Sequence, residues 1–330
     1  MSVPQNSGRG CIVVGLDEHG QPARSLVAAA DEAQRRGTDL AVVTVVRPQL
    51  DLGLNIFDRQ REQSLAQATA LQDLHAAGAS ARASHPGLAV VTYCLGEGEV
   101  GPGREPLLWA DLLVIGTQDR SGRQALGEGS VSWLLLNSSR CPVLVVPERT
   151  PRHDSDPAAL PLILVGVSEH PADAAVVQAA YAAAGGRACE VLLLHSYALR
   201  GQETVEQGRD RAEALLADYV ARAPSGTQVS MALSQEEPAS AMLRLAANAM
   251  LLVIGGRTGA LSGLVRGSVS HAVLEAVPCP VLAVPRHLVD TRPGPLAGLN
   301  VNGADVNDQA SAQPTTWDPS AQDAKAEPHP

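Results

Sequence analysis

A glycine-rich segment in the first half of the chain has the residue types of an anion site. It runs from Gly116 to Ser130, after an apolar run typical of a buried strand and before a helical pattern. The first backbone N–H groups of that helix, together with the Ser130 hydroxyl, can bind a phosphate without a lysine. Gly129 has no Cβ, so the backbone there can approach an anion closely.

An aspartate occupies a related position earlier in the chain. Asp17 directly follows the apolar run CIVVGL, and Gly116 directly follows the apolar run LLVI. In an open parallel sheet, ligands bind outside the carboxyl ends of the strands, so both residues are expected at one edge. Asp17 can accept hydrogen bonds from an adenine amino group or a sugar hydroxyl, and Gly116 leaves space for a base or ribose. Together with the anion site, these residues form a candidate nucleotide site.

The chain contains this pattern twice. The segment that begins LLVIGTQDR at residue 112 has a counterpart that begins LLVIGGRTG at residue 251, and both continue to GSVS and CPVL. The runs 11–17 and 40–46 likewise recur as 162–168 and 191–197. A nearly constant offset between matching segments indicates two copies of one domain.

Each copy alternates short apolar runs with helical patterns. Continuous apolar runs indicate parallel strands that are buried on both faces, and right-handed crossovers then give a doubly wound α/β domain with a five-stranded parallel sheet. The expected strands are 12–16, 40–46, 88–94, 112–115, 143–146, 163–167, 191–195, 228–233, 251–254 and 281–284. The expected helices are 23–36, 60–77, 106–110, 131–138, 172–184, 204–223, 239–248 and 269–276.

Composition divides the chain into two domains, a linker and a tail. We expect the first domain over 1–147, a polar and proline-rich linker over 148–160, and the second domain over 161–286. Residues 287–330 contain few apolar side chains. We expect a disordered tail there, because it cannot bury enough surface to offset its chain entropy.

The composition also excludes several classes of function. The net charge of −10 argues against nucleic acid or an anionic membrane as a partner. Lys325 is the only lysine, which excludes a phosphate loop that needs one. No apolar run is long enough for a membrane span and no secretory signal is present, so we expect a cytoplasmic protein. The five cysteines are dispersed, which favours buried reduced thiols over disulfides or metal ligands.

Each copy resembles a universal stress protein domain in its strand order, its GSVS turn and its CPVLVVP or CPVLAVP ending. The whole chain resembles the tandem universal stress proteins of actinobacteria over about residues 10–147 and 161–286. The resemblance implies a Rossmann-like fold, similar to adenine nucleotide alpha hydrolases, and binding of ATP with Mg²⁺ or Mn²⁺. It also implies that the fifth strands of the two copies meet as an internal pseudo-dimer, and it leaves homo-oligomers open.

The nucleotide-binding members of that family carry a Gly-x2-Gly-x9-Gly-Ser/Thr pattern after an aspartate that closes the first strand. In the first copy the resemblance assigns ligand contacts to Asp17 and the Val45 backbone (base), Gly116 (ribose), and Gly129, Ser130 and Val131 (phosphates). Asp119 stands in place of the second glycine. Its carboxylate would repel a triphosphate unless a divalent cation bridges the two.

The second copy keeps less of the pattern. The aspartate is replaced by Ser168, and Thr258 stands at the second glycine. The loop from Gly255 to Gly267 and Ser268 is one residue shorter than in the first copy. We therefore expect the nucleotide in the first copy.

Simpler interpretations of these residues remain open. The two Gly-Ser pairs can be helix N-caps, where serine is a preferred residue. His195 closes an apolar run and is typical of a structural histidine rather than a catalytic one. No triad spacing and no general base is recognisable, so no catalytic residue is assigned and at most weak ATP hydrolysis is expected.

Two functions remain from the sequence. The first is an adenine-nucleotide-binding regulator of the stress response that acts through nucleotide-dependent contacts with an unidentified protein partner. The second is a nucleotide-free interaction scaffold whose binding loops have degenerated, as the replaced glycines at Asp119 and Thr258 suggest.

Overall fold

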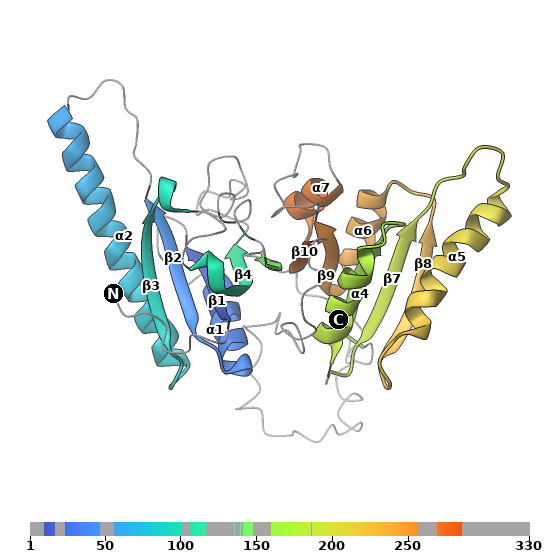
Figure 1. Ribbon diagram of the computed structural model, residues 1–330, viewed down its shortest axis with the longest axis horizontal. Coiled ribbons are helices and arrows are strands. Elements are labelled where there is room, and N and C mark those ends of the chain that lie inside the picture. The colour runs from blue at the N-terminus through green and yellow to red at the C-terminus, as the bar shows by residue number, and fades with distance from the viewer. Residues whose placement is uncertain are drawn as a thin grey trace, which may run out of the picture.

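The two halves of the chain form one continuous ten-stranded sheet (Figure 1). The computed structural model describes residues 10–16, 24–46, 56–100, 106–116, 135, 139, 141–147, 160–185, 187–256 and 269–285. The order of the strands across the sheet is β3-β2-β1-β4-β5-β10-β9-β6-β7-β8. Their bounds are Cys11–Leu16 (β1), Leu40–Val46 (β2), Val90–Gly96 (β3), Ala110–Gly116 (β4), Val143–Val146 (β5), Leu162–Val167 (β6), Glu190–Ser196 (β7), Gln228–Ser234 (β8), Ala249–Gly256 (β9) and Val281–Pro285 (β10). The predicted α/β class with two five-stranded parallel halves is confirmed.

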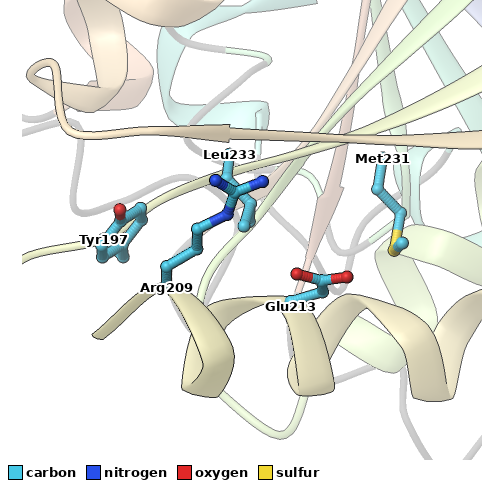
Figure 2. A pocket seen from close by; sticks show the side chains of 5 residues that line it. All are labelled: Tyr197, Arg209, Glu213, Met231 and Leu233. Carbon is cyan, nitrogen blue, oxygen red and sulfur yellow. The ribbon is translucent and has the colours of Figure 1, made fainter. Parts of the chain in front are cut away.

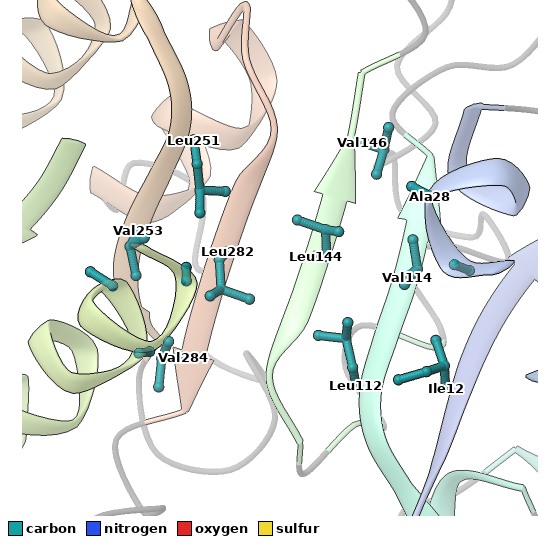
Figure 3. Packing of buried hydrophobic residues seen from close by; sticks show 14 of the residues in the cluster. Ile12, Ala28, Leu112, Val114, Leu144, Val146, Leu251, Val253, Leu282 and Val284 are labelled. Atoms are coloured by element: carbon teal, nitrogen blue, oxygen red, sulfur yellow. The ribbon is translucent and has the colours of Figure 1, made fainter. Parts of the chain in front are cut away.

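The halves meet through their fifth strands. β5 runs antiparallel to β10, with Leu144 opposite Leu282 and Val145 opposite Val281. The other pairings among the described strands are parallel. Leu144 and Leu282 are both 0% exposed and lie on neighbouring strands in Figure 3. The predicted meeting of the CPVLVVP and CPVLAVP segments is therefore confirmed as a junction within one chain.

Alternate residues of each strand face opposite helical layers. On β1, Ile12 and Val14 pack in a core with α1, α2, α4 and α5, whereas Val13 packs in a second core with α6 and α7. The helices are α1 (Arg24–Arg36), α2 (Ile56–Ser84), α4 (Asp173–Ala184), α5 (Val205–Ala221), α6 (Pro238–Ala246) and α7 (Val269–Ala276), with short 3-10 turns η1 (Glu97–Glu99) and η2 (Leu107–Trp109). Because both faces of the sheet are covered, inner strands such as β1, β5 and β10 are apolar and buried at every position.

A glycine ends α1 and aims the chain at the next strand. Gly37 has a φ of 62°, the left-handed conformation that glycine adopts without a Cβ penalty. Its N–H donates to the Gln34 carbonyl at 3.1 Å, and the Thr38 N–H donates to the Ala33 carbonyl at 3.0 Å. These bonds satisfy the last carbonyls of the helix shortly before β2 begins at Leu40.

Helix α2 is longer than the sequence predicts. The predicted helix ended at residue 77, before Gly78, but α2 continues to Ser84. A Cβ on Gly78 would lie 3.1 Å from Cγ2 of Thr92, so this glycine provides a close contact with β3 instead of a helix end. β3 correspondingly begins at Val90, later than the predicted residue 88.

The strand order reverses once in each half. β1 lies between β2 and β4, and β6 lies between β7 and β9. Ligands of doubly wound folds bind outside the carboxyl ends of the strands at such a reversal. We call the carboxyl ends of β1, β2 and β4 the first rim, and those of β6, β7 and β9 the second rim.

Candidate functional site

The first rim contains two of the predicted ligand residues. Leu16 ends β1 opposite Thr44 of β2, and Val45 is the next residue along β2. Gly116 ends β4, which lies beside β1 in the sheet. Val45 is 1% exposed and packs in the core, so its side chain is not available to a ligand. The fold thus brings Val45 and Gly116 to the same rim.

The other predicted ligand residues divide between the second rim and undescribed parts of the chain. Gly255 lies near the end of β9, opposite Val284 of β10. The predicted residues that lie outside the described residues are Asp17, Asp119, Gly129, Ser130, Val131, Gly267 and Ser268.

A glycine that the site prediction missed shapes the first rim. A Cβ on Gly15 would lie 2.5 Å from Cδ1 of Leu135, which is 0% exposed. Leu135 follows the glycine-rich segment in sequence, and Gly15 allows its side chain to pack directly on β1. The sequence contained a signal for this contact, because CIVVGLD and LILVGVS carry glycine at the same position, Gly15 and Gly166.

At the second rim, the residue that follows the first strand, β6, makes a structural contact. Ser168, the counterpart of Asp17, donates from its N–H and its hydroxyl to Oδ2 of Asp173, at 2.7 Å and 2.6 Å. Asp173 is 1% exposed and is the first residue of α4, where a carboxylate is favoured by the helix dipole. The sequence prediction did not identify Asp173. Its carboxylate is bonded to Ser168, the residue at the position that Asp17 occupies in the first half.

His195 also has a structural role at the second rim. Its Nδ1 lies 2.9 Å from the Val167 carbonyl, and since a carbonyl only accepts, Nδ1 carries the proton. Thr44 occupies the equivalent position in the first half and donates to the Leu16 carbonyl at 3.4 Å. His195 is 3% exposed, and its contact with the strand-end carbonyl is typical of a structural histidine.

The cysteines are free thiols without activation. Burial raises the pKa of Cys11 and Cys279 to about 12 and that of Cys141 to about 11. A thiol that keeps its proton at neutral pH is a poor nucleophile and metal ligand. Cys189 is also buried, whereas Cys94 is partly exposed. The prediction of buried reduced thiols is thus confirmed for all of them except Cys94.

Neither a cluster of metal-ligating side chains nor a membrane-spanning helix occurs among the described residues. The part of the chain that the structure describes contains no group of three or more His, Cys, Asp or Glu that could hold a metal ion. Within the same part, no helix combines the length and the apolarity that crossing a bilayer requires.

Sequence comparison identifies relatives of both halves. The family model of the universal stress protein family matches residues 10–147 and 162–285. A universal stress protein of Mycobacterium tuberculosis is 33% identical over 193 residues, which cover 52% of this chain and 61% of that protein. The chain therefore spans about three fifths of the length of that relative. A universal stress protein of Mycolicibacterium smegmatis is 27% identical over 296 residues, covering 83% of this chain and 96% of that protein.

A solved structure shares the fold. The crystal structure of a universal stress protein from Archaeoglobus fulgidus matches with a TM-score of 0.56 at 18% identity, over 84% of this chain and 96% of that chain. The family match covers the strands and helices of both halves. On this evidence, the chain belongs to the universal stress protein family.

Proposed function

We propose that the first rim binds an adenine nucleotide, namely ATP with Mg²⁺ or Mn²⁺, and that its occupancy controls contacts with a protein partner during stress. The observation that carries the proposal is the strand reversal between β1 and β4, with Val45 on the neighbouring β2 and Gly116 at the end of β4. Asp17 follows β1 directly in sequence, and Gly116 opens the segment that leads to Gly129 and Ser130.

Each residue has a defined task in this proposal. Asp17 and the backbone of Val45 hold the base, and Gly116 leaves room for the ribose. The backbone N–H groups of 129–131 and the Ser130 hydroxyl hold the phosphates. Mg²⁺ and Mn²⁺ prefer carboxylate and phosphate oxygens, so a cation between Asp119 and the phosphates offsets their repulsion.

The first rim suits the nucleotide better than the second. At the second rim, Ser168 offers no carboxylate to a base, and both its N–H and its hydroxyl are bonded to Asp173. The side chain at the Asp17 position is thus already engaged in the second half. This contact supports one nucleotide per chain, in the first half.

The test is the nucleotide content and ATP affinity of the full chain. Freshly purified protein is denatured and the released nucleotide is identified, and calorimetry then follows titration of the emptied protein with ATP and Mg²⁺. We expect one ATP per chain in the wild type and at least about tenfold weaker binding in Asp17→Ala and Gly129→Asp. Ser168→Ala, the matched change in the second half, should bind as the wild type does.

Two outcomes would contradict the proposal. A wild type that releases no nucleotide and gives no heat with ATP would instead favour the nucleotide-free scaffold, for which the substituted glycines at Asp119 and Thr258 are the supporting observation. Binding that is lost in Ser168→Ala but kept in Asp17→Ala would place the nucleotide in the wrong half.

A further inference from the structure

A pocket of about 360 Å³ lies between helix α5 and strand β8 (Figure 2). It is lined by Tyr197, Arg209, Glu213, Met231 and Leu233. β8 is the outer strand of the second half, and β7 separates it from the rim strand β6. The pocket volume is in the range of sites that hold small molecules.

Two opposite charges in this pocket have no partner among the described residues. Figure 2 shows Arg209 and Glu213 projecting from α5 toward the strand that carries Met231 and Leu233. They stand four residues apart, about one helical turn, on the same face of α5. By contrast, Arg211 of the same helix forms ion pairs with Glu203 and Glu169.

The remaining walls are apolar or aromatic. Met231 is 41% exposed although its neighbour along the same strand face, Leu233, packs against the core. The phenol oxygen of Tyr197 accepts a hydrogen bond from the Gln235 side chain at 3.2 Å. A Cβ on Gly208 would lie 2.6 Å from Cδ2 of Leu199, so this glycine allows α5 to pack closely on the segment that follows β7.

We infer that the pocket binds a small zwitterion with an apolar side chain, of which an apolar α-amino acid is the simplest example. Arg209 takes the carboxylate, Glu213 takes the ammonium group, and Met231 and Leu233 contact the side chain. Four helical residues span about 6 Å along the axis. The guanidinium and the carboxylate can each form a charge-assisted hydrogen bond of about 2.8 Å with the end of the zwitterion that carries the opposite charge.

Other ligand classes fit this pocket less well. The carboxylate of Glu213 repels phosphates and dicarboxylates, and the guanidinium of Arg209 repels diamines. An uncharged apolar ligand would cover both charges and leave them without a partner, which is costly.

The test is titration of the full chain with L-leucine and L-methionine, followed by calorimetry and by thermal shift. N-acetyl-L-leucine and L-leucinamide, which each lack one of the two charges, serve as ligand controls. We expect saturable 1:1 binding of the free amino acids, and at least about tenfold weaker binding of both derivatives. Arg209→Met and Glu213→Gln should each weaken amino-acid binding by a similar factor. Both residues are exposed, so the variants should fold, which circular dichroism checks.

Matched variants separate this site from the rest of the chain. Arg222→Gln changes an exposed arginine that caps α5 outside the pocket, and it should leave amino-acid binding unchanged. Asp17→Ala should also leave it unchanged, because the proposed nucleotide site is separate. Absence of amino-acid binding in the wild type, or binding that survives both Arg209→Met and Glu213→Gln, would overturn the inference.

Discussion

Gly15 and Gly166 occupy the same position in the two halves but admit different side chains. A Cβ on Gly15 would lie 2.5 Å from Cδ1 of Leu135, and a Cβ on Gly166 would lie 2.5 Å from Cε of Met242. Leucine branches near its end and Leu135 is fully buried, whereas methionine is unbranched and bends easily. Gly15 therefore makes a rigid contact in the first half, whereas its counterpart Gly166 makes an adaptable one in the second.

This difference predicts unequal effects of alanine in the two halves. Gly15→Ala should lower the free energy of unfolding by about 1–3 kcal/mol, because the extra methyl group overfills a packed core. Gly166→Ala should cost less, since Met242 can move its terminal methyl group. Urea unfolding of the two variants measures both values, and a loss in Gly166→Ala equal to that in Gly15→Ala would contradict this account.

At the scale of elements, α5 is the helix that sets the pocket geometry. Its N-cap Thr204 accepts from the Gln207 N–H at 3.2 Å, and the Gln207 side chain accepts from the Thr204 N–H at 2.9 Å. This capping box fixes where the helix begins and hence which residues face β8. Arg209 and Glu213 follow on that face.

Loss of the cap should therefore loosen the start of α5. Thr204→Ala should lower the free energy of unfolding by about 0.5–2 kcal/mol, as measured by urea denaturation. Thr204→Ser keeps the hydroxyl oxygen and should retain most of the stability. An alanine variant as stable as the wild type would show that the capping box does not hold the helix start.

The elements differ in how well the sequence predicts them. The inner strands, such as β1, β5 and β10, could be predicted because they are buried on both faces and therefore apolar throughout. The end of α2 could not, because Gly78 is a helix breaker in isolation and a packing residue only when β3 lies against it. The pocket could not be predicted either. An Arg–Glu pair four residues apart is common on exposed helices. It can be recognised as part of a pocket only when the position of α5 over β8 is known.

The same distinction applies to the candidate site. That Val45 and Gly116 reach one rim could be predicted, because parallel strands end at the same edge. The bond between Ser168 and Asp173 could not, because it depends on where α4 begins relative to β6. Sequence patterns thus locate strand ends more easily than they identify the side chains bonded there.

At the scale of the whole molecule, the β5–β10 junction couples the two halves. Leu282 of the second half and Leu144 of the first half are fully buried and lie directly opposite each other across the junction. A cavity on one side of this junction should therefore lower the local stability of the strands on the other side. Core leucine-to-alanine changes typically cost about 2–5 kcal/mol.

Hydrogen exchange followed by mass spectrometry tests this coupling. Leu282→Ala, although in the second half, should speed exchange in β4 and β5 of the first half. Leu193→Ala is the matched control, because Leu193 is equally buried but lies on β7, away from the junction. Equal effects of both variants on β4 and β5 would show that the junction has no special part in the coupling.

The covalent link across this junction also has a consequence for how the protein can change. In a homodimer built from identical subunits, every mutation appears at both copies of a site, so neither copy can specialise alone. Here β5 and β10 belong to one polypeptide, and their pairing does not weaken on dilution. The gene can therefore alter Ser168 or the lining of the α5 pocket and leave the first rim untouched. Substitutions in one half can therefore change its surface without a matching change in the other half.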